Sequence, residues 1–326
     1  MVFVMVVLGG LTRLTESGLS MVEWRPLSVL PPLSESEWQE SFAKYQLYPE
    51  YKEKNVGMTL SEYKGIFWLE FIHRNWGRLL GVVFLVPFVW FLARGWVDRR
   101  LGRRLGGIFI LGGLQGGMGW FMVASGLSTR PDVSQYRLTV HLGLAVLILA
   151  AMFWLALDLL ADERYGSDRA RGPVPLKRAM ALVLLTFVTI LSGGFVAGLD
   201  AGFAYNTFPL MDGRWVPEGL FSLQPALLNL FENTVTVQFD HRILAETLVS
   251  LIVLLWLGTR RALLPERARL ALNAFAGMAL VQLLLGIGTL LLVVPTPLAA
   301  THQAGAVVLF TLGLWLVHEL RGCRVA

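Results

Sequence analysis

Seven long stretches of mostly apolar residues recur along the chain, and they limit its fold more than any other feature. A helix needs about 20 largely apolar residues to cross a bilayer. Helices are the expected structure, because lipid cannot satisfy the polar groups of an open backbone. The stretches are residues 66–93, 105–125, 138–161, 179–199, 243–258, 268–294 and 298–317.

Residues 1–12 are apolar as well, but they are too short for a complete span. We expect them to belong to a first helix that is either cropped or continues into residues 15–18. A cleaved signal peptide is not favoured, since the segment has no basic start and no clear small-residue cleavage site. The chain is 55% hydrophobic and only 16% charged, unlike an ordinary soluble domain. We therefore predict an all-α polytopic membrane protein with eight transmembrane helices.

Basic residues gather in the connections on one side of this topology. Two short connections on the opposite side carry one arginine (126–136) or no charge (293–298). The positive-inside rule then predicts that both termini lie in the cytoplasm or its equivalent. This asymmetry accounts for the net charge of +5 without a nucleic-acid partner, which we do not expect. The basic segments are 94–104, 164–178, 260–269 and the tail from Arg321.

Two long connections, 19–65 and 199–236, fall on the less basic side. Loops of this length are uncommon in compact proteins unless they are functional, so we expect them to cover a site. The single cysteine is Cys323. It excludes a disulfide within the chain and a cysteine-based metal site.

Several short motifs recur in the same order, which indicates an internal duplication. An even number of spans in each half gives the two halves the same orientation. We predict two tandem, pseudo-symmetric four-helix bundles, residues 1–165 with outer loop 19–65 and residues 179–320 with outer loop 199–236. The matched motifs are Gly9-Gly10 and Gly193-Gly194, Gln115-x3-Gly119 and Gln282-x3-Gly286, His73 and His241, and His141 and His302.

Four of the five histidines stand at the beginning of alternate apolar spans, where the predicted topology places them near the outer surface. A lone histidine at a membrane end is usually an interfacial polar residue. Four at equivalent depth, two in each half, favour a functional site, because ionisable residues in spans are costly. They are His73, His141, His241 and His302.

Two histidines on neighbouring helices of a four-helix bundle suit a metal centre held between them. Zinc needs four ligands, or three and a water molecule, and each half offers only two histidines. Haem supplies four nitrogens of its own and needs one or two axial ligands, so the pattern favours haem. A porphyrin also needs space, and a small residue stands four positions after each histidine: Gly77, Ala145, Ala245 and Ala306.

An arginine follows the first histidine of each half, Arg74 after His73 and Arg242 after His241. Two roles remain open for these arginines. They pair with haem propionates as carboxylate forks, or they extend to lipid headgroups.

One matched position differs between the halves. Glu70 stands three residues before His73, whereas Gln238 stands three residues before His241. The spacing puts each side chain on the same helix face as its histidine. A carboxylate exchanges protons or positions a reacting group, and an amide takes up no proton at neutral pH. Glu70 is therefore a candidate catalytic residue, with chemistry in the first half and electron transfer in the second; an interfacial charge is the plainer alternative.

Six segments spread over nearly the whole chain form a specific combination. They are GGLTRLTESGLSMVEWRPLSVLPP (9–32), EFIHRNWGRLLG (70–81), VSQYRLTVHLG (133–143), SGGFVAGLDAGFAYNTFPLM (192–211), QFDHRIL (238–244) and PTPLAATHQAG (295–305). Together they resemble the haem A synthase family in its mitochondrial-type branch. Some bacterial members carry a cysteine pair in the first outer loop, which this chain lacks. A thiol-based role is therefore excluded here.

The resemblance implies an oxidoreductase that oxidises the C8 methyl group of haem O to the formyl group of haem A, for use in cytochrome oxidase. Two successive oxidations would give an alcohol and then a geminal diol, which loses water. The family also has a haem b cofactor. Glu70 matches the family's required glutamate. The implied substrate-haem residues are His73, His141 and Arg74, and the implied cofactor-haem residues are His241, His302 and Arg242, with the four histidines as axial ligands of iron.

The resemblance also implies a setting: a bacterial inner membrane, or the mitochondrial inner membrane in a eukaryote, with both termini on the cytoplasmic or matrix side. Expected partners are haem O, the lipid bilayer, a haem O synthase and an electron donor; a homo-oligomer is left open. Two other functions fit the histidine pattern, a bis-haem electron carrier of cytochrome b type and a haem transporter or chaperone. Identification of the bound haems and of the product distinguishes these functions.

Overall fold

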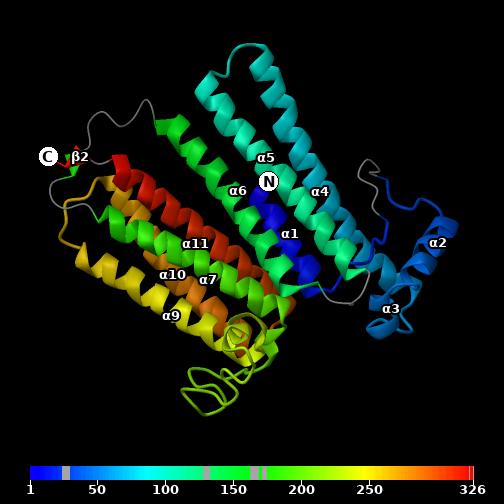
Figure 1. Cartoon of the computed structure of the whole chain (residues 1–326). Coiled ribbons are helices and arrows are strands. Elements are labelled where there is room, and N and C mark those ends of the chain that lie inside the picture. Colours follow the sequence, from blue (N-terminus) through cyan, green and yellow to red (C-terminus); the bar gives the residue numbers. More distant parts are fainter. Residues whose placement is uncertain (24–29, 128–132, 162–168, 171–174, 323, 326) are drawn as a thin grey trace. The chain divides into compact units, whose positions relative to one another are not determined.

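The computed structural model describes residues 1–23, 30–127, 133–161, 169–170, 175–322 and 324–325, and the fold is mainly helical (Figure 1). Two strands of two residues, β1 (Arg169–Ala170) and β2 (Arg324–Val325), pair in parallel. The helices are α1 (Val2–Leu14), α2 (Glu35–Tyr45), α3 (Pro49–Glu53), α4 (Leu60–Ala93), α5 (Arg99–Gly126), α6 (Gln135–Ala161), α7 (Leu176–Gly198), α8 (Asn229–Glu232), α9 (Thr234–Gly258), α10 (Glu266–Leu291) and α11 (Thr296–Gly322), with two 3-10 turns, η1 (Ala201–Phe203) and η2 (Ala226–Leu228).

Seven helices in the described part of the chain are long and apolar enough to cross a membrane: α4, α5, α6, α7, α9, α10 and α11. They coincide with the seven apolar stretches, so the helical structure predicted for those stretches is confirmed, and each helix is long and apolar enough to span a bilayer. The segment 1–12 forms α1, which has 13 residues and is shorter than these seven. Its role as an eighth span stays a prediction.

Several helices begin before the apolar stretch that predicted them. Helix α4 starts at Leu60, because Thr59 and Glu62 form a capping box: each side chain accepts the other residue's backbone N–H, at 3.3 and 2.7 Å. Helix α9 starts at Thr234, where Asn233 accepts two backbone N–H groups. Hydropathy does not detect these polar first turns. The histidines of α4 and α9 therefore lie well inside their helices.

The described residues form two compact units, Met1–Ile148 and Leu149–Ala326. The division falls inside α6, whereas the repeat pattern placed the boundary at residues 166–178. The two tandem bundles therefore remain a prediction, and each unit is described by itself. Arg164 and Arg171 of the basic connection lie outside the described residues.

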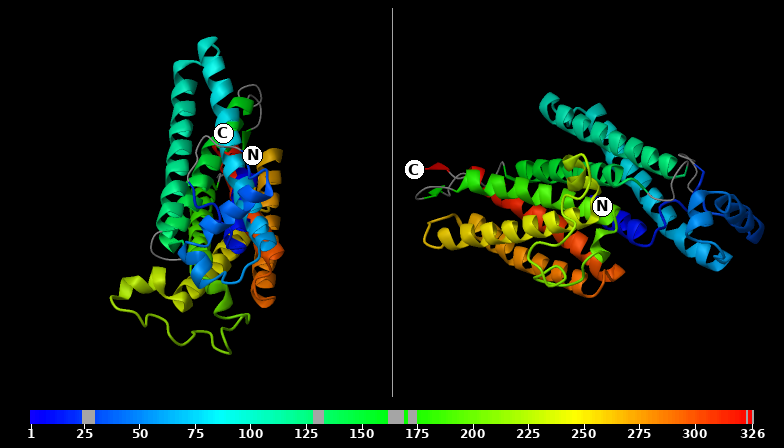
Figure 2. Two further views of the ribbon diagram at one scale, coloured as in Figure 1. Left: turned by 90° about the vertical axis from the view of Figure 1, so that its right-hand side faces the viewer. Right: turned by 60° about the horizontal axis from the view of Figure 1, so that its bottom comes forward.

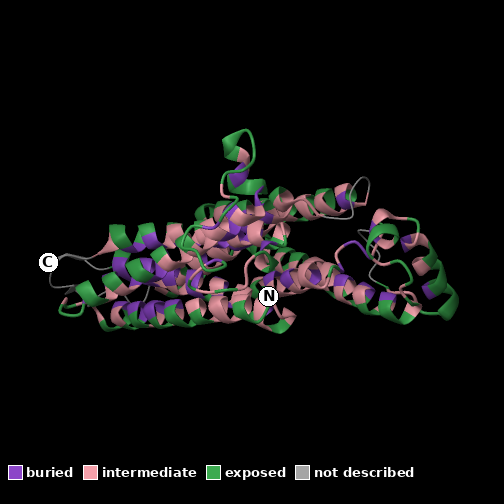
Figure 3. Ribbon diagram, turned by 90° about the horizontal axis from the view of Figure 1, so that it is seen from below, coloured by how far each residue is buried: buried purple, intermediate pink, exposed green. Residues whose placement is uncertain are grey.

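The second unit has its core where α7, α9, α10 and α11 pack side by side (Figures 1 and 2). Large buried side chains such as Ile252, Phe275 and Leu316 fill this core, and Figure 3 shows buried residues along these helices. Helix α10 contributes several fully buried alanines, including Ala271 and Ala279. Small residues let helices approach closely, which matters in lipid because van der Waals packing replaces the hydrophobic effect.

The first unit contains α1 packed on α4, and an aromatic cluster at the N-terminal end of α4. The cluster joins α2 to α4: the rings of Trp38 and Phe67 are 4.9 Å apart, and those of Tyr45 and Tyr63 are 5.2 Å apart. Edge and stacked contacts of this kind add to the stability of an aromatic core. The cluster ties the connection 19–65 to the turns of α4 that precede His73.

Glu50 of α3 is buried beside this cluster, where it accepts a hydrogen bond from the Tyr45 hydroxyl at 3.1 Å. Burial raises the pKa of Glu50 from 4.5 to about 8. The folded state therefore holds this proton more tightly than the unfolded chain does. The resulting stability is complete below pH 4.5 and is lost as the pH rises through about 8.

We expect Glu50→Gln to remove this pH dependence. Each unit between the two pKa values corresponds to about 1.4 kcal/mol. The native protein is therefore expected to lose several kcal/mol of unfolding free energy at most as the pH rises. Thermal unfolding followed by tryptophan fluorescence, to which Trp38 contributes from within the cluster, measures it in detergent at a series of pH values. The exposed Glu53 provides the matched control, Glu53→Gln. Parallel pH profiles for native protein and Glu50→Gln would contradict the assignment.

Candidate functional site

The histidines predicted as ligands come together in pairs. In the first unit, His73 of α4 and His141 of α6 are close enough to interact electrostatically. In the second unit, the same holds for His241 of α9 and His302 of α11. All four rings are partly buried. Each unit therefore brings two imidazoles from two different helices near each other.

Each imidazole lies against a glycine of a neighbouring helix. These glycines are the repeated motifs of the sequence, but their contact with the histidines was not predicted. The small residues expected to give space were others, and one of them, Gly77, faces Met5 instead. A Cβ atom would lie 3.3 Å from Nε2 of His73 if built on Gly9, 3.1 Å from Cε1 of His141 on Gly119, 3.3 Å from Cε1 of His241 on Gly193, and 2.9 Å from Cε1 of His302 on Gly286.

Polar neighbours also contact three of the four rings. The Ser192 hydroxyl lies 2.8 Å from Nδ1 of His241. The Gln282 amide nitrogen lies 3.1 Å from Nδ1 of His302 and donates to that residue's carbonyl at 2.9 Å. In the first unit, the Gln115 amide nitrogen lies 3.3 Å from Nε2 of His141 and donates to its carbonyl at 3.1 Å.

Unpaired polar atoms are concentrated at these histidines. Within the described part of the chain, six buried side-chain atoms have no hydrogen-bond partner: Oε1 of Gln115, Oγ1 of Thr139, Nδ1 of His141, Oε1 of Gln238, Nε of Arg242 and Oε1 of Gln282. Each belongs to a histidine, to a residue that contacts one, or to a residue within three positions of one. A buried polar atom without a partner costs about 1–3 kcal/mol. Their position indicates that both histidine pairs suit a ligand with polar groups.

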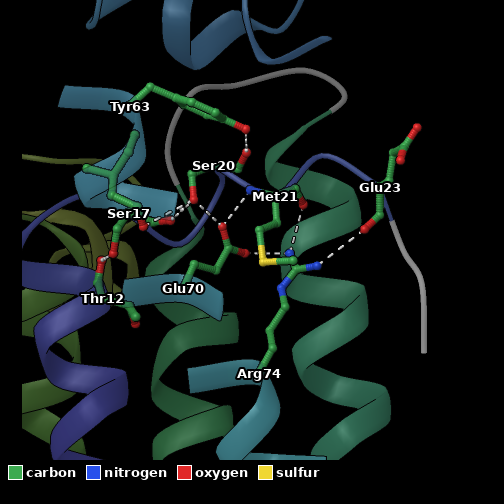
Figure 4. A network of polar contacts seen from close by, with 9 residues as sticks. Thr12, Ser17, Ser20, Met21, Glu23, Tyr63, Glu70 and Arg74 are labelled. Atoms are coloured by element: carbon green, nitrogen blue, oxygen red, sulfur yellow. Dashed lines mark hydrogen bonds and ion pairs between the residues drawn. The ribbon is translucent and has the colours of Figure 1, made fainter. Parts of the chain in front are cut away.

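Glu70 is the centre of a buried network in the first unit (Figure 4). Its side chain is 2% exposed. One carboxylate oxygen accepts from the Ser20 hydroxyl and from the Met21 backbone N–H, both at 2.7 Å. The other oxygen forms an ion pair with Arg74. Tyr63 adds a hydrogen bond to the Ser20 carbonyl at 3.3 Å, so the aromatic cluster supports the network.

Arg74 is held by this network and by the connection that follows α1. It donates to the Met21 carbonyl at 2.9 Å and to the Glu23 carbonyl at 3.4 Å. It also lines a cavity of about 100 Å³, together with Met21, Trp120 and other residues of the first unit. Arg74 therefore bridges Glu70 and a space large enough for only a small group.

The second unit has Gln238 and Arg242 at the matched positions, so an uncharged amide replaces the carboxylate of Glu70. Arg242 donates to the carbonyls of Tyr205 and Thr207, both at 2.9 Å, as Arg74 does to the first connection. Gln238 donates to the Tyr205 carbonyl at 3.0 Å. Glu70 thus accepts from a backbone N–H where Gln238 donates to a backbone carbonyl. The side-chain difference that the sequence revealed reverses the hydrogen bond.

The donor set fits haem better than a bare metal ion. Among the described residues, no three His, Cys, Asp or Glu side chains come together as a cluster able to hold a metal ion. Two imidazoles satisfy the axial positions of a haem iron, whose other four ligands come from the porphyrin. The arginine beside each first histidine provides a cation for a carboxylate.

Fold and site together define a polytopic helical membrane protein with two pairs of neighbouring histidines, of the class that suits haem binding. Residues 1–314 match the family described as cytochrome oxidase assembly protein (COX15-CtaA), and the chain belongs to this family.

Individual relatives match nearly the whole chain. A protein named heme A synthase from Nitrosospira multiformis is 56% identical over 322 residues, which cover 98% of this chain and 90% of that protein. One of the same name from Paramagnetospirillum magneticum is 55% identical over 98% of this chain and 90% of its own length. Heme A synthase COX15 from Homo sapiens is 47% identical over 97% of this chain and 79% of its own length.

Proposed function

We propose that this chain is an oxidoreductase that converts haem O to haem A. The relatives named heme A synthase support the proposal, since the similarity extends over almost the entire chain. The observation that carries it is the grouping of unpaired buried polar atoms around two histidine pairs, each ring seated against a glycine. An enzyme that oxidises one haem and uses a second haem as its cofactor needs two such sites.

We assign the first pair, His73 and His141, to the substrate, and the second pair, His241 and His302, to haem b. The Glu70 network supports this division, because only the first unit carries a carboxylate at the matched position. Haem b supplies reversible one-electron transfer when it is bound. In the second unit, Arg242 has one buried nitrogen left for a propionate, and in the first unit Arg74 lines the neighbouring cavity.

Glu70 acts on the substrate side of the reaction in this proposal. Two successive oxidations of the methyl group give an alcohol and a geminal diol, and loss of water from the diol gives the aldehyde. Each two-electron oxidation uses an oxidant from outside the chain and moves protons, and a carboxylate beside the substrate is suited to exchange those protons. The Ser20, Met21 and Arg74 contacts hold that carboxylate in one position, so it also orients Arg74 toward the substrate.

The proposal includes two four-helix bundles with α1 as the eighth span and the histidines near the outer face. It places the protein in the bacterial or mitochondrial inner membrane with both termini inside. The repeated motifs and the equivalent contacts of Arg74 and Arg242 support the tandem arrangement. Haem O synthase and an electron donor are the expected partners.

Thiol labelling tests this topology, because the chain has one cysteine to remove. In a Cys323→Ser background, we expect Glu53→Cys to react with a membrane-impermeant maleimide in intact spheroplasts. Arg260→Cys, on the basic side, is expected to react only after permeabilisation. Both residues are exposed, so the labelling reports sidedness. The reverse pattern would move all four histidines to the inner face.

The activity is tested in cells that make haem O but no haem A. Expression of the chain is expected to yield haem A in the extracted haems, and the purified protein is expected to contain haem b. A bis-haem carrier would keep both haems unchanged, and a transporter would hold no tight cofactor. Haem O recovered without haem A would therefore overturn the proposed reaction and leave those two functions.

A further inference from the structure

The Ser192 hydroxyl determines which nitrogen of His241 carries the proton. Ser192 lies on α7, one residue before the glycine that seats the His241 ring. Its Oγ donates to the Thr189 carbonyl at 2.8 Å and lies 2.8 Å from Nδ1 of His241. A hydroxyl has one proton, and the carbonyl can only accept. With that proton on the Thr189 carbonyl, Ser192 accepts from Nδ1–H of His241, and the lone pair of the neutral ring lies on Nε2.

This tautomer is the one that binds iron through Nε2. A hydrogen bond on the far nitrogen fixes ring orientation and raises the basicity of the ligating nitrogen, and such partners matter for metal sites generally. His241 is therefore oriented as an axial ligand by the folded protein itself. Gln282 also faces Nδ1 of His302, but its amide nitrogen is a donor, so this contact does not place a proton on Nδ1 of that ring.

The first unit has no equivalent of this contact. The residue before Gly9, the matched glycine, is Leu8, which has no hydrogen-bonding group. In the described part of the chain, no hydrogen bond to the His73 ring is formed, and its Nε2 edge faces Gly9. For His141, Gln115 faces Nε2, and Nδ1 is buried without a partner. Among the described residues, no hydrogen bond therefore holds His73 or His141 in the tautomer that leaves the Nε2 lone pair free for iron.

We propose that Ser192 is a positioning residue that makes the second site a permanent haem site, and that Leu8 leaves the first site able to exchange its haem. The proposal rests on the function proposed above, and it explains a requirement of that function. A cofactor must stay bound through many turnovers, whereas substrate must enter and product must leave. One serine–leucine difference at the matched position supplies this distinction.

The test compares Ser192→Ala with Ser192→Thr in the purified protein. Alanine favours helix, so α7 is expected to fold normally. We expect Ser192→Ala to transfer haem b to apomyoglobin about tenfold faster, the lower end of the effect of losing such a partner. Its midpoint potential is expected to rise, because a less basic imidazole stabilises ferric iron less. Ser192→Thr keeps the hydroxyl, and we expect it to behave as the native protein does.

The reciprocal change is Leu8→Ser, made in a His241→Ala protein so that only the first site binds added haem b. We expect haem to leave this variant more slowly than it leaves the His241→Ala parent. Native transfer rate and potential in Ser192→Ala would overturn the proposal. So would equal defects in the alanine and threonine variants, since packing rather than the hydrogen bond would then matter. Failure of His241→Ala itself to remove haem b would instead contradict the proposed function.

Discussion

Replacing Glu70 with glutamine is expected to abolish haem A formation while haem b remains bound. The change keeps the size of the side chain and removes the carboxylate, so the first site comes to resemble the second, where Gln238 stands. General acid–base groups contribute roughly 100-fold or more to rates. We expect haem A to fall by at least that factor, with the hydroxylated intermediate accumulating in place of product.

The hydrogen bonds of Glu70 explain why an amide cannot replace it. Its carboxylate faces only donors: the Ser20 hydroxyl, the Met21 N–H and Arg74. A glutamine would turn its NH2 group toward one of them, and two donors that face each other leave both unsatisfied. Gln238 avoids this conflict because it faces a carbonyl. The network that holds Arg74 is therefore lost together with the proton acceptor.

Chromatography of haems from cells that supply haem O measures the effect. Glu70→Asp separates the two roles, since it keeps the charge but shortens the reach, and partial recovery is expected. Glu53→Gln, a change at an exposed residue of the same connection, is expected to leave the yield unchanged. A native yield of haem A from Glu70→Gln would remove Glu70 from the chemistry and favour the carrier function.

The fold was predictable from the sequence where lipid dictates it. Seven helices follow from the length of their apolar runs, because a run of about 20 apolar residues satisfies its own backbone in a bilayer as a helix. The beginnings of α4 and α9 were not predictable from hydropathy, since their first turns are polar and are set by caps at Thr59 and Asn233. The short α1 has too few residues for length alone to decide its role.

The site residues were predictable as types but not as contacts. The histidines and the Glu70–Gln238 difference stand at matched positions of the motifs that recur in the same order. What the repeat could not give is the partner of each ring. The contact of Ser192 with His241, or of Gly286 with His302, joins helices whose relative rotation the sequence does not specify. Gln115 and Gln282 were noticed only as repeat markers, and their matched positions were the available signal.

Replacing either histidine of the second pair with alanine is expected to remove haem b almost completely. In the proposed site, His241 and His302 would each supply one of the two protein nitrogens that hold the haem, and a methyl group would supply none. The reason for expecting near-complete loss is the polar environment. Polar contacts to the unpaired atoms of Gln238, Arg242 and Gln282 would not replace the lost nitrogen ligand. Reduced-minus-oxidised absorbance of the purified variants measures the low-spin haem.

His73→Ala and His141→Ala are the matched controls, since they make the same change at the equivalent positions of the first unit. They are expected to keep haem b and to lose haem A formation, because the substrate loses its axial ligand while the cofactor does not. A native content of haem b in both second-unit variants would contradict the assignment of His241 and His302 as ligands. Loss of haem b from the first-unit variants instead would exchange the two sites. Glu70 would then lie beside the cofactor haem. There it would influence electron transfer and would not act on the methyl group of the substrate.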